Sequence, residues 1–95
     1  MKVLVMEIEI RVSWVHSLKE KRMIVNSIIQ KLKNKFNISI GEVNSQDNHK
    51  IIGIGLSMVC GTKAIADGAK EKILFFIEGN CEGEIVNIFD EIIHY

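Results

Sequence analysis

Several features are scarce or missing in this 95-residue sequence, and each absence excludes a class of protein. There is no proline, and the only two cysteines, Cys60 and Cys81, form no CxxC pattern of a metal or redox site. We therefore expect two free thiols in a reducing compartment rather than a disulfide. No apolar run approaches the length of a membrane span, because Glu7, Glu9 and Arg11 interrupt the first apolar segment.

The first residues also lack the basic start and small-residue cleavage site of a signal peptide, so we expect a cytoplasmic protein without membrane association. No glycine-rich phosphate loop precedes a predicted helix. His16, Asp47 and His49 are metal ligands by type, but histidines beside a polar turn are usually solvated, so we predict no metal and no cofactor. The length suits one domain over residues 1–95 with a single core.

The net charge is zero, but the charges are unevenly distributed along the chain. Residues 1–50 carry nine Lys and Arg against five Asp and Glu, whereas residues 51–95 carry three against seven. Half of the basic residues lie in one predicted helix and are opposed there only by Glu20: Lys19, Lys21, Arg22, Lys31, Lys33 and Lys35. This helix either contacts RNA or an acidic protein, or is an ordinary solvated surface.

The same helix has a clear start signal in residues 17–22, Ser-Leu-Lys-Glu-Lys-Arg. Ser17 and Glu20 form a capping box, in which the hydroxyl accepts a backbone N–H and the carboxylate reaches back to the cap. Apolar residues then recur at helical spacing and predict a helix to about Lys35. Lys21 shares this apolar face, so its ammonium group needs a partner close to the core.

Alternating apolar residues predict four strands, over 2–12, 36–42, 51–60 and 84–93. In the first strand the even-numbered side chains face the core. Residues 44–48 are polar and read as a hairpin tip between the second and third strands. In the last strand we expect Val86 and Ile88 to face the core and Phe89 the opposite side.

A second helix is predicted between the third and fourth strands, with Thr62 as its N-cap and Gly79 as the residue that ends it. Its predicted buried stripe consists of Ile65, Ala69, Ile73, Phe76 and Ile77. The resulting order β-α-β-β-α-β favours a ferredoxin-like α/β sandwich, a four-stranded antiparallel sheet with both helices on one face. Right-handed crossovers place the third strand between the first and the second.

This topology brings the helix start and the hairpin to one end of the sheet. Lys21 and Glu42 then point into the same space, and we predict an ion pair between them. The candidate binding residues are Lys19, Lys21, Arg22, Lys31, Lys33, Lys35, Glu42, Gln46, Asp47 and His49. Either the pair closes the core, or the cluster binds an anion or small ligand or catalyses a reaction.

The sheet face opposite the helices is expected to be uncovered by this chain. It carries Glu7 and Glu9 and no aromatic residue on the two central strands, which argues against RNA bases stacking there. Small residues such as Gly53 and Gly55, flanked by apolar ones such as Phe89, suggest that something packs on this face. We expect a second copy of the chain, because two-fold dimers are the commonest assembly.

Several segments resemble the YlxP-like family of small bacterial proteins: residues 17–22, Lys35 to Ile40, Glu42-Val43 and Gln46-Asp47. The match extends over nearly the whole chain. It implies a ferredoxin-like fold, a cytoplasmic location and a chromosomal neighbourhood with translation and ribosome-maturation genes. The family has no established activity, so the resemblance implies no catalytic residue. Where the family has an acid after the Glu-Val pair, this sequence has Asn44.

The leading hypothesis is a non-enzymatic module that binds RNA or the ribosome through the basic helix.

Overall fold

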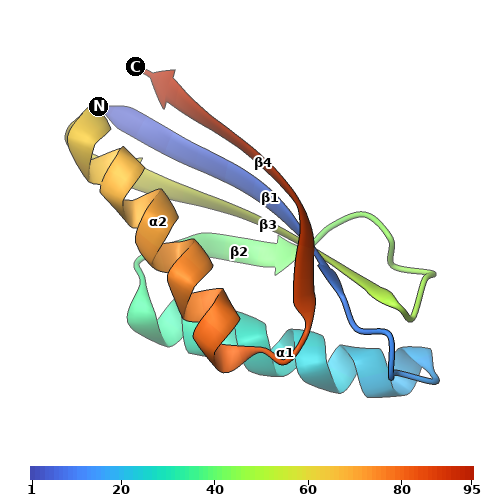
Figure 1. The fold of residues 1–95 in the computed structure, drawn as a ribbon. Helices are drawn as coiled ribbons and strands as arrows, with labels where there is room; N and C mark the ends of the chain where they lie inside the picture. The colour runs from blue at the N-terminus through green and yellow to red at the C-terminus, as the bar shows by residue number, and fades with distance from the viewer.

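The computed structural model describes residues 1–95 and confirms the ferredoxin-like βαββαβ order (Figure 1). The elements are β1 (Lys2–Arg11), α1 (Leu18–Lys35), β2 (Ser39–Glu42), β3 (Ile51–Cys60), α2 (Lys63–Asn80) and β4 (Glu84–His94). The sheet order is β2-β3-β1-β4, and every neighbouring pair is antiparallel. The third strand thus lies between the first and second, as predicted. Neither helix is long and apolar enough to cross a membrane.

The core lies between the helices and one face of the sheet. Alternation along β1 is the main signal for it, since side chains two apart share a face. The even-numbered residues Leu4, Met6, Ile8 and Ile10 are all fully buried. In the antiparallel register Ile8 stands opposite Ile54, so the two central strands present one continuous apolar surface to the helices.

The start of α1 follows the predicted capping box with one difference. Ser17 Oγ accepts a hydrogen bond from the Glu20 N–H at 3.1 Å, which satisfies one free donor of the first turn. The Glu20 carboxylate accepts from the backbone N–H of His16 at 3.5 Å rather than from that of Ser17. The cap therefore also holds the loop that enters the helix.

The buried stripe of α2 differs from the predicted one. Ala66, Ala69, Ile73 and Ile77 are buried, whereas Ile65 is 55% exposed. The prediction for Ile65 was wrong because the first turn of α2 directs Ala66, the next residue, toward the core instead. Gly79 does not end the helix, which continues to Asn80 and has Cys81 as its C-cap.

The two outer strands also depart from simple alternation. β2 begins only at Ser39, because Phe36 serves as the C-cap of α1. In β4 a bulge lets Ile85 and Asn87 pair with consecutive residues of β1, so that Val86 is left over. Ile85 therefore packs against the core, and Val86 does not, contrary to the prediction.

The sheet face opposite the helices is partly covered by the chain itself. A Cβ atom on Gly53 would lie 2.0 Å from the carbonyl oxygen of Val43, and one on Gly55 would lie 3.0 Å from a Val43 methyl group. Val43 follows β2 and turns over this face. The expectation of an uncovered face is therefore wrong at this end, and the two glycines have a partner within the chain.

Candidate functional site

Lys21 is the most unusual side chain of the predicted cluster, because only 1% of it is exposed. Its ammonium group donates to three backbone carbonyls, those of Ser45 at 2.9 Å, Asn48 at 2.9 Å and Ile51 at 3.1 Å. A lysine has three N–H donors, so all of them are used. Lys21 thus ties α1 to the loop that joins β2 and β3.

The predicted ion pair is confirmed, with Lys21 Nζ 3.3 Å from Glu42 Oε2. The same Glu42 oxygen makes no hydrogen bond, although it is within reach of the ammonium group. Because the three lysine donors point at carbonyls, charge alone holds the carboxylate. Its side chain is 22% exposed, so solvent also contributes to its stabilisation.

This arrangement leaves the ammonium group of Lys21 no free donor for a ligand. Five hollows in the surface are lined neither by Lys21 or Glu42 nor by the hairpin residues Gln46, Asp47 and His49. Gln46 and Asp47 are exposed, and His49 is half-buried. No three His, Cys, Asp or Glu residues are grouped to hold a metal ion.

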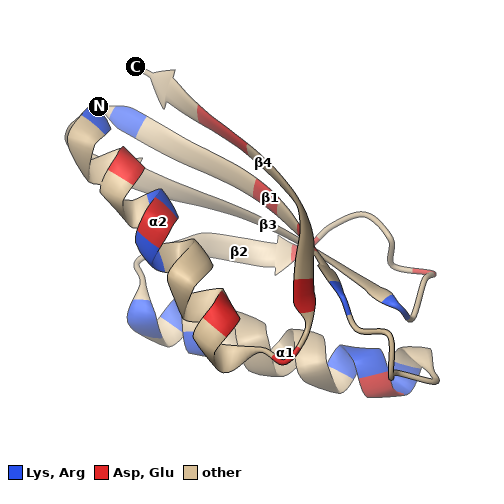
Figure 2. Ribbon diagram, viewed as in Figure 1, with Lys and Arg blue, Asp and Glu red and all other residues tan.

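The remaining cations of α1 are all exposed and none has a carboxylate within 4.0 Å. They are Lys19, Arg22, Lys31, Lys33 and Lys35. Figure 2 shows basic residues at both ends of α1 and others on α2 and the strands, while the acidic residues lie mostly on α2 and the strands. The charged residues are therefore unevenly distributed in space as well as along the sequence.

The five cations do not form a single face. At 100° per residue, Lys19, Arg22 and Lys33 fall on one outward side of α1, together with the amides Asn26 and Gln30. Lys31 and Lys35 fall on the flank toward α2, where Lys31 lines a hollow with Glu78 and Glu82. We call Lys19, Arg22, Asn26, Gln30 and Lys33 the outward row; it contains no carboxylate.

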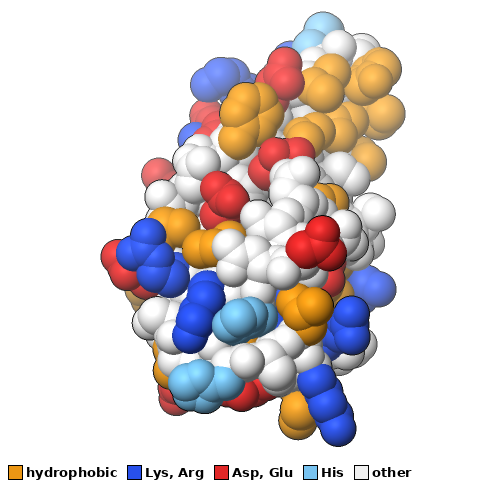
Figure 3. Space-filling model, turned by 90° about the vertical axis from the view of Figure 1, so that its right-hand side faces the viewer, with side chains coloured by type: hydrophobic (Ala, Val, Ile, Leu, Met, Phe, Trp, Pro, Cys, Tyr) orange, Lys and Arg blue, Asp and Glu red, His pale blue; other side chains and the backbone are white.

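Figure 3 views the molecule from the end where α1 begins and the β2–β3 loop lies. Lys, Arg and His side chains gather in the lower part of this face, with acidic side chains among them. The loop itself is held by Lys50, whose ammonium group donates to the carbonyl of Ser13 at 2.6 Å. This end therefore offers exposed charge on an anchored backbone.

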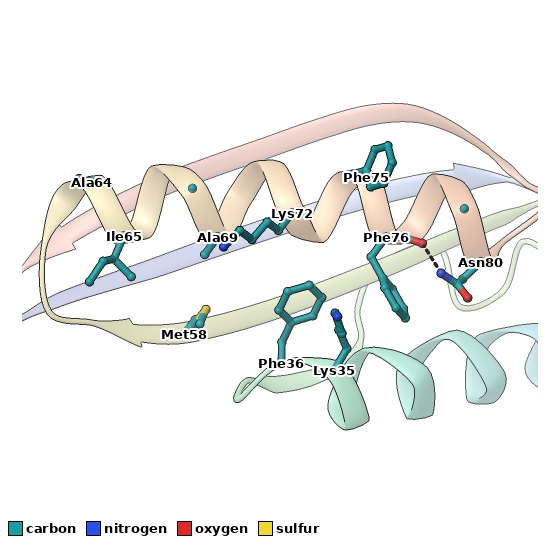
Figure 4. A pocket seen from close by; sticks show the side chains of 12 residues that line it. Lys35, Phe36, Met58, Ala64, Ile65, Ala69, Lys72, Phe75, Phe76 and Asn80 are labelled. Atoms are coloured by element: carbon teal, nitrogen blue, oxygen red, sulfur yellow. Dashed lines mark hydrogen bonds between the residues drawn. The ribbon is translucent and has the colours of Figure 1, made fainter.

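One surface was missed by the sequence analysis, an apolar groove of about 850 Å³ beside α2. Figure 4 shows Phe36 and Met58 on one side and residues of α2, including Ile65 and Phe76, on the other. The sequence analysis assigned Ile65 and Phe76 to the core and therefore predicted no apolar surface formed by them. Its only signal in the sequence is that apolar residues occupy more than one side of α2.

Comparisons with known proteins agree with this architecture. A family profile described as "Protein of unknown function (DUF503)" matches residues 3–89. The chain belongs to this family. A relative, "Uncharacterized protein YlxP" of Bacillus subtilis (strain 168), is 34% identical over 62 residues, which are 65% of this chain and 67% of the relative. The resemblance to the YlxP-like family is thereby confirmed, and the family description assigns no activity.

Two solved structures show the same fold without indicating function, since both are designed proteins. De novo designed protein Foldit4 superimposes with a TM-score of 0.55 at 17% identity and covers 98% of each chain. De novo designed protein LFR1 1 with ferredoxin fold gives a TM-score of 0.59 at 14% identity, over 100% of this chain and 88% of the design. The ferredoxin-like fold therefore does not depend on any shared site.

Proposed function

We propose that this protein is a non-enzymatic binding module whose outward row on α1 contacts the phosphate backbone of RNA, including RNA of the ribosome. The observation that carries the proposal is the composition of this row. Lys19, Arg22 and Lys33 supply three exposed cations, Asn26 and Gln30 supply amides between them, and no carboxylate neutralises the row. Cations position a protein on phosphates, and amides can hydrogen-bond sugars and bases.

Two of these cations are difficult to explain by helix stability. Lys19 and Arg22 lie in the first turns of α1, where the positive end of the helix dipole disfavours cations. Lys33 and Lys35 lie in the last turn, where the dipole favours them. Cations at the unfavourable end support a role in binding an anion.

The enzyme and small-ligand alternatives have less support. They require a cavity beside Lys21 and Glu42, and the ammonium group of Lys21 already donates all of its hydrogen bonds within the chain. The Lys21–Glu42 pair is best explained as an anchor for the β2–β3 loop.

RNA binding by the outward row predicts a steep dependence on salt. We expect binding of a fluorescein-labelled single-stranded RNA, followed by anisotropy, to weaken as salt is raised. The plot of log affinity against log salt becomes less steep by about 0.7 for each phosphate contact that is lost. The triple variant Lys19→Glu, Arg22→Glu, Lys33→Glu removes three such contacts, so the magnitude of its slope should decrease by about 2. Its affinity should fall strongly.

The matched control changes the net charge by the same amount at three lysines that lie outside α1: Lys2→Glu, Lys63→Glu and Lys72→Glu. It should retain most of the affinity and the slope. If both variants lost the same affinity, the effect would depend on net charge alone and not on the outward row. If the unmodified protein did not bind RNA, the proposal would be refuted. Co-sedimentation with ribosomes, with and without nuclease, tests whether RNA is the component contacted.

A further inference from the structure

The apolar groove beside α2 lies between the two helices. Figure 4 shows α2 as one wall and Lys35 and Phe36, at the end of α1, on the other side, with Met58 of β3 between them. Its volume of about 850 Å³ is within the range of about 300 to 1,000 Å³ that is typical of small-molecule sites. The groove shares no residue with the Lys21–Glu42 pair or with the outward row on α1.

The groove has an aliphatic end and an aromatic end. Met58, Ile65 and Ala69 line it near the start of α2, and Phe36 and Phe76 line it farther along that helix (Figure 4). The two rings pack edge to face with their centroids 5.8 Å apart, so this part of the groove is formed within the chain itself. A ligand with a long apolar body would therefore remove apolar surface from water along the groove.

Two of the three polar side chains that line the groove are cationic. Lys35 lies on the α1 side and Lys72 on the α2 side, and no Asp or Glu lines the groove. Neither ammonium group has a carboxylate within 4.0 Å. The third polar side chain, Asn80, donates to the carbonyl of Phe76 at 2.9 Å. The polar group of a ligand that matches this groove is therefore an anion.

Pairing within α2 does not explain the lysine that lines the groove. A lysine on a helix can pair with acids three or four positions away, but those neighbours of Lys72 are two phenylalanines, a glycine and an alanine. The other two lysines of α2 do have partners, Lys63 with Asp67 at 3.0 Å and Lys70 with Asp90 at 3.4 Å. The lysine beside the groove is thus the one lysine of α2 without a carboxylate.

We propose that the apolar groove binds a free long-chain carboxylate. The alkyl chain lies along the groove against Met58 and Ile65, and the carboxylate lies at the rim, where Lys35 and Lys72 reach it from opposite sides. The chain supplies the apolar surface that the groove matches, and the head group supplies the charge that both lysines lack. A recess between two helices accepts a single chain from solution, whereas the flat surface of a bilayer does not fit it.

Binding is tested first with laurate below its micelle concentration, measured as displacement of the fluorescent fatty acid cis-parinarate from the unmodified protein. Dodecyltrimethylammonium has an alkyl chain of the same length and the opposite charge, and it should bind at least about fivefold more weakly. Butyrate retains the carboxylate but lacks the long chain, so it should not displace the probe. If laurate did not bind, or if both head groups bound equally, the proposal would be wrong.

The two lysines are tested together by Lys35→Met and Lys72→Met in one chain. This variant should bind laurate about fivefold more weakly or worse, and should lose the preference for laurate over dodecyltrimethylammonium. Lys33→Met with Lys63→Met is the matched control, because it removes one lysine from each helix outside the groove. The control should retain both the affinity and the preference. The same loss in both variants would contradict a role for the lysines that line the groove.

A substitution that fills the groove tests where the chain lies. A Cβ atom on Gly68 would meet no atom within 4 Å, so Gly68→Leu extends into the groove without disturbing the fold, and it should abolish binding of both fatty acids. Gly61→Leu is equally free of contacts but lies outside the groove, and should bind normally. Circular dichroism should be unchanged in both variants.

Two further results would overturn the proposal. One is normal laurate binding by Gly68→Leu. The other is an acidic amphipathic helical peptide that occupies the groove more tightly than laurate does, since the occupant would then be a protein segment. Because the groove lies outside the outward row, none of these outcomes depends on RNA binding by α1.

Discussion

Replacing Lys21 by methionine is expected to lower the free energy of unfolding by about 3 kcal/mol or more. Methionine retains most of the buried stem, so packing changes little. The carbonyls of Ser45, Asn48 and Ile51 lose the donor that now reaches them, and the Glu42 carboxylate loses its neutralising charge. Urea unfolding followed by circular dichroism measures the difference.

Two further variants show which part of the network matters. Lys33→Met removes an exposed lysine with no carboxylate partner and should change stability by no more than about 0.5 kcal/mol. Glu42→Gln should cost clearly less than Lys21→Met, because the buried Glu42 oxygen accepts no hydrogen bond. If Lys21→Met were within about 1 kcal/mol of wild type, the three carbonyl contacts would not be what anchors the loop.

Replacing Gly53 by alanine is expected to cost about 3 kcal/mol, toward the upper end for overpacking a folded chain. The new Cβ atom would lie 2.0 Å from the carbonyl oxygen of Val43, a backbone atom that cannot move aside alone. Relief requires loss of the hydrogen bond from the Val43 N–H to the Gly53 carbonyl, now 2.8 Å long. The same urea measurement applies.

The neighbouring glycines provide the controls. Gly41→Ala places a methyl group where no atom lies within 4 Å, and stability should change by about 0.5 kcal/mol at most. Gly55→Ala meets the Val43 side chain at 3.0 Å, and the additional change Val43→Ala should relieve it. Val43→Ala should not rescue Gly53→Ala, since the clash there is with the backbone. Equal tolerance of alanine at positions 41 and 53 would contradict the close approach of Val43.

Much of the fold was predictable because it depends on local periodicity. The alternation of β1 identified its buried side chains, and the signals at Ser17 and Thr62 located both helix starts. Errors arose where the local pattern allows two answers. Ile65 and Ala66 are both apolar, and only the tertiary structure shows that Ala66 is the buried one; Val86 is displaced by a bulge that has no local signal.

The sequence by itself determined the order of the elements, the family and the proximity of Lys21 to Glu42, because chain direction and crossover handedness follow from the pattern. Only the tertiary structure decided what Lys21 binds, since its acceptors are backbone carbonyls and any residue has one. It also placed Lys31 beside a hollow that Glu78 and Glu82 line as well. It left Phe75 exposed, because the sheet can cover only one side of α2.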